Sequence, residues 1–100
     1  MTIVLQQSMP AEIMPMLEEV TDAMGVDADP PEGMIIHVHF EQDGQARILD
    51  VWESEQAYET FRDNRLMPAM QKVLSEHGME MPQQGPASST AEVQRMVRGR

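Results

Sequence analysis

The dipeptide Asp43-Gly44 constrains the fold of this chain more than any other feature of the sequence. It separates two segments, residues 34–41 and 46–52, in which apolar and polar side chains alternate. An Asp-Gly pair favours the two-residue turn of a β-hairpin, because both turn positions need positive φ angles that few other residues adopt easily. The sequence therefore predicts two antiparallel strands joined by a tight turn, with His37 directly opposite Asp50.

A strand and a helix are predicted before this hairpin. Residues 2–6 are rich in β-branched side chains and indicate the first strand. Apolar side chains at helical spacing over residues 13–24 indicate a helix that begins close to Pro15, since an interior proline loses a backbone hydrogen bond. Gly25 is placed to end this helix, and the prolines and glycine of residues 27–33 predict a loop.

A second helix and a final strand are predicted after the hairpin. Ser54 is a suitable N-cap for the helix, which we expect to break and restart near Asn64 and Pro68 and to end at Gly78. Residues 79–81 are compatible with a short last strand. The predicted order is β-α-β-β-α-β, which is the arrangement of ferredoxin-like α+β folds.

The domain organisation follows from this order. Residues 1–82 are expected to form one ferredoxin-like α+β domain, and residues 83–100 a polar linker with a basic C-terminal tail. An antiparallel sheet with both helices on one face leaves its other face bare. In a chain of 100 residues a second copy is the usual cover, so a homodimer is expected.

The composition excludes several classes of function. A formal net charge of −10 makes nucleic acid and anionic membrane surfaces poor partners. No apolar run is long enough to span a membrane and no signal pattern opens the sequence, so a cytoplasmic location is expected. Because the chain has no cysteine, disulfides, thiolate metal sites and a cysteine nucleophile are excluded.

The expected register divides the hairpin side chains between two faces of the sheet. One face is largely apolar and is predicted to pack against the helices; it comprises Met34, Ile36, Val38, Phe40, Arg47, Leu49 and Val51. The other face is mixed and is predicted to lie beneath the second subunit; it comprises Ile35, His37, His39, Ile48, Asp50 and Trp52. The dimer would thus enclose two imidazoles, a carboxylate and the only tryptophan.

His37 and Asp50 are the candidate catalytic residues. Directly opposed Cβ atoms lie about 4.5–5.5 Å apart, which permits a hydrogen-bonded pair, and an oriented histidine is the commonest general base. The alternative is a satisfied polar pair with no catalytic role. A metal site of His37, His39 and Asp50 is a further alternative, but histidines two residues apart are common by chance, so no metal is predicted.

Five further residues are predicted to line a substrate-binding cavity: Ile35, His39, Ile48, Trp52 and Tyr58. Trp52 offers a stacking wall for a planar ligand, but the commoner role of so large a side chain is to fill the core. The eleven methionines suit pockets that adapt to varied apolar ligands, although most of them fall at the helical spacing of ordinary core residues.

The segment DVWES, residues 50–54, closes the hairpin, and an aromatic-bearing helix and the pattern Arg-Leu-x-Pro-Ala at residues 65–69 follow it. With these motifs, residues 2–81 resemble the dimeric α+β barrel superfamily of antibiotic-biosynthesis-monooxygenase-like proteins, in particular small actinobacterial-type members. The resemblance implies two ferredoxin-like sheets packed face to face, with a pocket between sheet and helices in each half. Relatives include cofactor-independent oxygenases acting on polycyclic phenols, polyketide cyclases, haem-degrading enzymes and proteins of no known activity.

The resemblance bears on two residues in particular. Trp52 matches a pocket-wall tryptophan of the oxygenase-like members, but the asparagine that they place nearby is missing here. His77 is the only candidate for the axial ligand of the haem degraders and has no supporting motif, so no cofactor is predicted.

The resulting prediction is a homodimer that binds a small apolar molecule, aromatic or polyketide-like, with His37 and Asp50 as an acid–base pair. Such a pair can support enolisation, cyclisation or cofactor-free oxidation. The alternative prediction is a non-catalytic structural or regulatory dimer.

Overall fold

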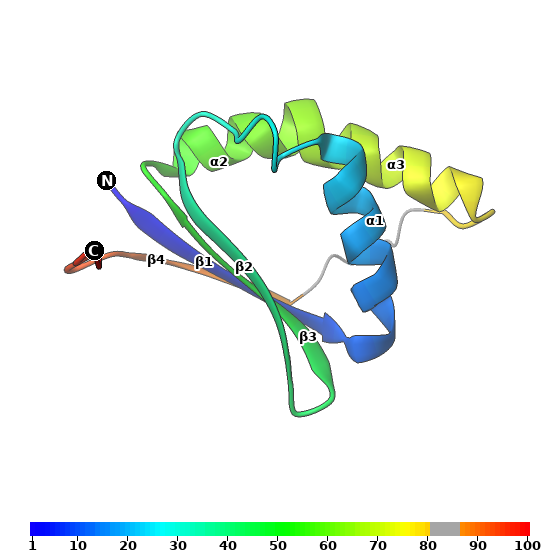
Figure 1. Cartoon of the computed structure of the whole chain (residues 1–100), viewed down its shortest axis with the longest axis horizontal. Helices are drawn as coiled ribbons and strands as arrows, with labels where there is room; N and C mark the ends of the chain where they lie inside the picture. The colour runs from blue at the N-terminus through cyan, green and yellow to red at the C-terminus, as the bar shows by residue number, and fades with distance from the viewer. Residues whose placement is uncertain (81–86) are drawn as a thin grey trace.

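The chain folds into one antiparallel sheet with helices on one of its faces (Figure 1). The computed structural model describes residues 1–80 and 87–100. Its elements are β1 (Ile3–Pro10), the short 3-10 turn η1 (Ala11–Ile13), α1 (Met14–Met24), β2 (Met34–Gln42), β3 (Gln45–Trp52), α2 (Glu55–Phe61), the π-helical turn η2 (Arg62–Leu66), α3 (Met67–Glu76) and β4 (Ala87–Glu92). The sheet order is β2-β3-β1-β4, so the predicted ferredoxin-like α+β class is confirmed.

The Asp-Gly hairpin and its register are confirmed. Asp43 and Gly44 have φ angles of 54° and 74°, as the tight turn requires. His37 pairs with Asp50 across β2 and β3. The register shifts by one residue between Met34 and Ile36, so that Met34 faces Trp52, and the predicted pairing of Ile35 with Trp52 is wrong. A bulge of this kind inserts an extra residue that local alternation does not reveal.

The predicted helix boundaries follow from capping chemistry. Ser54 accepts a hydrogen bond from the backbone N–H of Ala57 at 3.1 Å, and Gly25 ends α1 with a φ angle of 67°. The expected break in the second helical region is the π-helical turn η2, where the N–H of Met67 bonds the carbonyl of Arg62. Pro68 follows directly and has no N–H to donate to the carbonyl four residues earlier, which favours the wider turn at this place.

The last strand lies in a part of the chain that was predicted to be a linker. β4 pairs antiparallel with β1, and the backbone N–H of Val93 extends this ladder to the carbonyl of Thr2 at 2.9 Å. Residues 79 and 80 are not in a strand, and residues 81–86 lie outside the described part of the chain. The serines, threonine and alanines of β4 are all exposed and show no apolar alternation, so pairing with β1 defines this strand and composition does not.

The helices cover the mixed face of the sheet, opposite to the prediction. Trp52 is fully buried against Phe61 and Tyr58, and Ile3 and Val26 complete this core cluster. Leu5 and Ile48 are also buried on this face. The prediction assumed that the more apolar face of a hairpin must meet the helices. It failed because the polar side chains of the mixed face satisfy one another and a carboxylate from α1, which offsets the cost of removing them from water.

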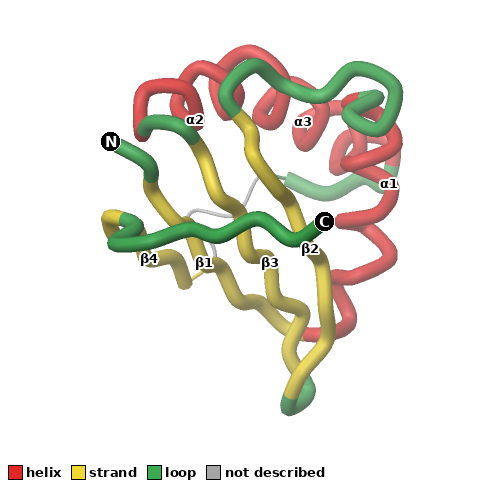
Figure 2. Tube along the Cα trace, turned by 60° about the vertical axis from the view of Figure 1, so that its left-hand side comes forward, coloured by secondary structure: helices red, strands yellow, loops and turns green. Residues whose placement is uncertain are grey.

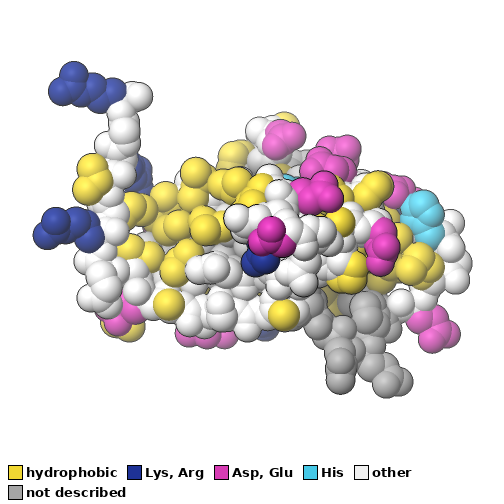
Figure 3. Space-filling model, turned by 90° about the horizontal axis from the view of Figure 1, so that it is seen from below, with side chains coloured by type: hydrophobic (Ala, Val, Ile, Leu, Met, Phe, Trp, Pro, Cys, Tyr) yellow, Lys and Arg dark blue, Asp and Glu magenta, His cyan; other side chains and the backbone are white. Residues whose placement is uncertain are grey.

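The apolar face of the sheet is left open. Ile36, Val38 and Phe40 of β2 are 49%, 37% and 38% exposed. Figure 3 shows this side of the molecule, with apolar side chains gathered over the sheet and the arginines of the C-terminal residues standing off one end. Figure 2 shows the four strands side by side in the order β4, β1, β3 and β2. A contiguous exposed apolar surface of this kind is typical of a protein–protein interface.

Among the described residues, no helix combines the length and the apolar character needed to cross a membrane.

Candidate functional site

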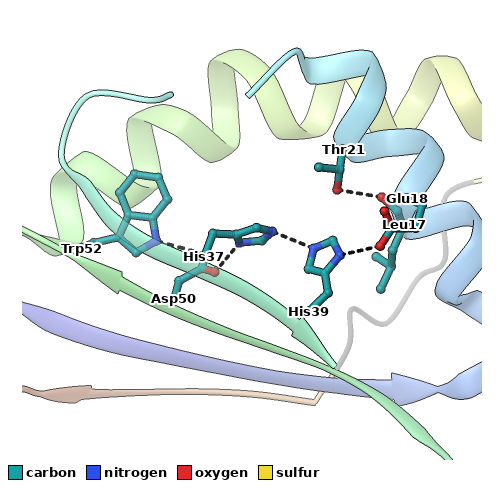
Figure 4. A network of polar contacts seen from close by, with 7 residues as sticks. All are labelled: Leu17, Glu18, Thr21, His37, His39, Asp50 and Trp52. Atoms are coloured by element: carbon teal, nitrogen blue, oxygen red, sulfur yellow. Dashed lines mark hydrogen bonds and ion pairs between the residues drawn. The ribbon is translucent and has the colours of Figure 1, made fainter. Parts of the chain in front are cut away.

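The helix-facing side of the hairpin carries a linear series of polar contacts, which we call the polar chain (Figure 4). Trp52 and Asp50 come from β3, His37 and His39 from β2, and Glu18 from α1. In each strand the contributing residues are two apart, so their side chains point to the same face. Antiparallel pairing then sets His37 beside Asp50, and α1 brings Glu18 to the outer end.

Each residue of the polar chain contacts the next through a hydrogen bond. The indole N–H of Trp52 donates to Asp50 Oδ2 at 3.1 Å, and Asp50 Oδ1 contacts His37 Nδ1. His37 Nε2 and His39 Nε2 are 2.6 Å apart. His39 Nδ1 and Glu18 Oε1 are 3.2 Å apart. All ring nitrogens of the two histidines are therefore engaged within the protein.

Burial differs sharply between the two ends of this chain. Asp50 is only 4% exposed, and it is the only charged or polar residue that is buried among the described residues. An isolated carboxylate in such a place would be costly, but hydrogen bonds to both of its oxygens offset much of the desolvation. The side chain of Glu18 is 58% exposed. The polar chain therefore connects the buried carboxylate of Asp50 with the solvent-exposed carboxylate of Glu18.

Tyr58 lies close to the buried end. Its ring stands edge to face against Trp52, with ring centroids 5.6 Å apart. Burial raises the pKa of the Tyr58 phenol above its usual value, and the negative charges of Asp50 and Asp63 add to this while Arg62 opposes it. The phenol thus stays protonated over the physiological range and can donate a hydrogen bond.

The structure brings together most of the predicted site residues. His37, Asp50, His39 and Trp52 form the polar chain, Tyr58 packs on Trp52, and Ile48 is buried opposite His39 on the same face. Ile35 lies at the bulge, partly buried and outside the regular pairing. The predicted enclosure of this face by a second subunit is wrong, because the protein's own helices cover it.

Glu18 is the site residue that the sequence did not reveal. It lies among several acidic residues of α1, and nothing in its spacing separates it from Glu19, which instead contacts His77. Only the packing of α1 against the edge strand β2 selects Glu18.

Neither a metal nor a haem ligand set emerges from the described residues. Within residues 1–80 and 87–100, no three histidine, aspartate or glutamate side chains are placed to hold a metal ion. His77 lies at the C-terminal end of α3, where its side chain is 46% exposed and its Nε2 atom is 2.8 Å from Glu19 Oε2. A nitrogen paired with a carboxylate at the surface does not fit the enclosed axial position that haem chemistry needs.

Two surface hollows are lined by other parts of the chain. One lies between the loop around Gly33 and the outer side of α2, and it reaches Asn64 and Arg65. The other lies over the open face of the sheet, between Phe40, Arg47 and Ser89. Neither is lined by the two histidines or by Trp52.

The comparisons with known proteins identify the fold. No family model matches the chain, and no curated protein matches it. Solved structures do match over nearly the whole length. A protein of Deinococcus radiodurans, provisionally assigned as an antibiotic biosynthesis monooxygenase, has 16% identity and a TM-score of 0.61 over 98% of this chain and 97% of its own.

Two further solved structures are similar. Rv0793 from Mycobacterium tuberculosis has 14% identity and a TM-score of 0.61, with 97% of each chain covered. A point mutant of MhuD, solved with two manganese protoporphyrin IX molecules in each active site, has 16% identity and a TM-score of 0.62 over 99% of this chain and 100% of its own.

The chain is thus a ferredoxin-like α+β protein with helices on one face of a four-stranded antiparallel sheet. More narrowly, it has the fold of the antibiotic-biosynthesis-monooxygenase-like α+β proteins, and the resemblance predicted from the sequence is confirmed at the level of the fold. At these identities the likeness establishes the fold alone. The DVWES segment as a family signature stays a prediction.

Proposed function

We propose that this protein is a homodimer that binds a small, largely apolar compound, aromatic or polyketide-like, and moves a proton on it with His37 and Asp50. The reaction class would be that of a cofactor-independent monooxygenase or a cyclase, in which an enolisable carbon loses a proton. The observation that supports this most is a buried carboxylate holding an imidazole beside the only tryptophan.

The chemistry follows from the order of the contacts. Asp50 accepts from His37 Nδ1–H, which orients the ring and leaves Nε2 as the basic nitrogen. Trp52 and Tyr58 supply aromatic surface beside it. Fold neighbours include a protein provisionally assigned as an antibiotic biosynthesis monooxygenase, which favours chemistry of this class.

A ligand must displace one contact before His37 can act. In the resting conformation His37 Nε2 is held by His39 Nε2 at 2.6 Å, so it is not free to accept a proton from a substrate. A substrate oxygen or acidic C–H placed between the two rings would take the place of His39. In this proposal His39 gives up its contact with His37 and keeps the one with Glu18.

The proposed dimer uses the open apolar face. Ile36, Val38 and Phe40 form its exposed stripe, and a second copy would remove them from water. Arg47 lies on the same face, and its Nε atom is buried without a hydrogen-bond partner among the described residues. A facing subunit could supply that acceptor. Val38→Glu places a charge in this interface and should yield monomers of 11.3 kDa by sedimentation. Gln71→Glu, at an exposed position of α3 on the helix side of the sheet, should not.

The test of the activity is turnover of a hydroxylated anthrone, an enolisable polycyclic phenol, followed by oxygen uptake and by chromatography of the product. His37→Ala should lower the rate by about 10²–10⁴-fold, the usual contribution of a general base. His77→Ala is the matched control, because it removes an exposed imidazole that contacts only Glu19 and should leave the rate unchanged. Equal rates for His37→Ala and the wild type would refute the assignment.

A second candidate function is a non-catalytic structural or regulatory dimer. The observation that favours it is that every ring nitrogen of His37 and His39 already has a partner within the protein. It predicts that His37→Ala lowers stability without changing any turnover, and that no small aromatic compound perturbs Trp52 fluorescence.

A further inference from the structure

The contacts of the two histidines require more protons than two neutral rings possess. Three contacts lie in series: Asp50 to His37, His37 to His39, and His39 to Glu18. A hydrogen bond needs one hydrogen between its two heavy atoms, so three hydrogens are needed. A neutral imidazole carries one N–H, and ionised carboxylates carry none. Two neutral rings would leave one contact with two facing lone pairs.

A single additional proton resolves this deficit. If His39 is the cation, it donates from Nε2 to His37 and from Nδ1 to Glu18, while neutral His37 donates from Nδ1 to Asp50. When the proton between the two Nε2 atoms moves to His37, His37 becomes the cation and His39 becomes neutral. His37 still donates to Asp50 and His39 still donates to Glu18. All three contacts keep their hydrogens in both arrangements.

We propose that His37 and His39 share one excess proton and pass it between the buried Asp50 end of the site and the exposed Glu18, which makes Glu18 the group that exchanges the site's proton with solvent. This inference rests on the proposed function, because it gives the proton taken by His37 a route to water. The step is a transfer of one proton over the 2.6 Å between the two Nε2 atoms. No bond to carbon and no oxidant is involved.

The surrounding charges support a cation in this position. Asp50 of β3 and Glu18 of α1 stand at opposite ends of the pair, and the nearby Tyr58 of α2 is neutral. Opposite charges within hydrogen-bond distance favour the charged form of an imidazole. The side chains of Asp50, His37 and His39 are 5%, 23% and 13% exposed, whereas that of Glu18 is 58% exposed, so Glu18 is the member of the relay most open to water.

The proposal can be tested on the ligand-free protein by nitrogen-15 NMR of the histidine rings at neutral pH. In the wild type, three of the four ring nitrogens of His37 and His39 should be protonated on average, with the two Nε2 atoms sharing one proton. Glu18→Gln should reduce this to two, because the glutamine amide can donate its own N–H to His39 Nδ1.

Glu19→Gln is the matched control. It removes the same charge one residue along α1, but Glu19 contacts His77 and not the pair, so the count should remain three. In the anthrone assay Glu18→Gln should lower the maximal rate by about tenfold or more with little change in KM, and Glu19→Gln should not.

A wild-type spectrum with only two protonated ring nitrogens, or an unchanged count in Glu18→Gln, would overturn the relay. These spectra require no substrate, so they separate the two ideas. A count of three with no turnover of the anthrone would support the shared proton and contradict the proposed function.

Discussion

Replacement of Asp50 by alanine tests whether the polar chain is buried beneath the helices. The substitution removes the acceptor of two hydrogen bonds, one from the indole of Trp52 and one from His37. Trp52 is 0% exposed, so water cannot replace the lost partner of its N–H group. The side chain of His37 is 23% exposed and can be partly solvated.

The expected loss of stability follows from these two groups. An unsatisfied buried donor costs about 1–3 kcal/mol, and we take about 2 kcal/mol for the indole N–H and about 1 kcal/mol for the partly accessible imidazole. Removal of a buried carboxylate also recovers about 1 kcal/mol or more of its desolvation cost. The free energy of unfolding should therefore fall by about 2 kcal/mol, out of the roughly 5–15 kcal/mol usual for a domain.

Urea unfolding followed by the fluorescence of Trp52, at one protein concentration throughout, measures this change. Asp50→Asn should lose less than about 1 kcal/mol, since its Oδ1 can accept from Trp52 while its Nδ2 donates to His37. Asp63→Ala is a surface control whose carboxylate contacts only the adjacent Arg62, and it should stay within about 0.5 kcal/mol of the wild type. An Asp50→Ala variant as stable as the control would refute the burial of this carboxylate.

Two further predictions concern packing and titration. Gly33→Ala should lower the free energy of unfolding by more than the roughly 1–2 kcal/mol expected for a positive φ alone, because its new Cβ would lie 2.6 Å from the Cβ of Ala57. Gly78 also has a positive φ, but a Cβ added there would meet no neighbouring atom. Gly78→Ala should therefore show only the smaller loss in the same urea assay. Tyr58, the single tyrosine, should titrate above its ordinary pKa of 10.0 in an ultraviolet absorbance titration, and Asp50→Asn should lower its pKa because one negative neighbour is lost. Since the folded pKa is the higher one, the folded state holds its proton longer, so stability should decline as pH rises from the unfolded pKa through the folded one.

Local chemistry explains what could be predicted from the sequence. The hairpin turn depends on two adjacent residues, Asp43 and Gly44, whose φ preferences decide its geometry. The register that pairs His37 with Asp50 follows from that turn, and the Ser54 cap follows from a side chain that bonds the backbone N–H of Ala57. Each of these features is settled within a few residues, so no knowledge of the tertiary structure was needed.

The parts that could not be predicted depend on contacts between distant segments. Both faces of the hairpin contain apolar side chains, so its composition did not decide which of them meets the helices. That choice depends on α1, which brings Glu18 to His39 across 21 residues of sequence. β4 likewise exists because β1 offers it a free edge, and its serine- and alanine-rich sequence gives little sign of a strand.

The reversal of the two faces separates the candidate site from the proposed interface. Had the second subunit covered His37 and Asp50, loss of the dimer would have exposed them to water. In the observed arrangement Trp52 and Asp50 are buried within the same chain, beneath its own helices, while Val38 and Phe40 stand on the opposite face. A single copy of the protein therefore contains the complete polar chain, so the proposed dimer on the open face would leave the contacts between His37, His39 and Glu18 unaltered.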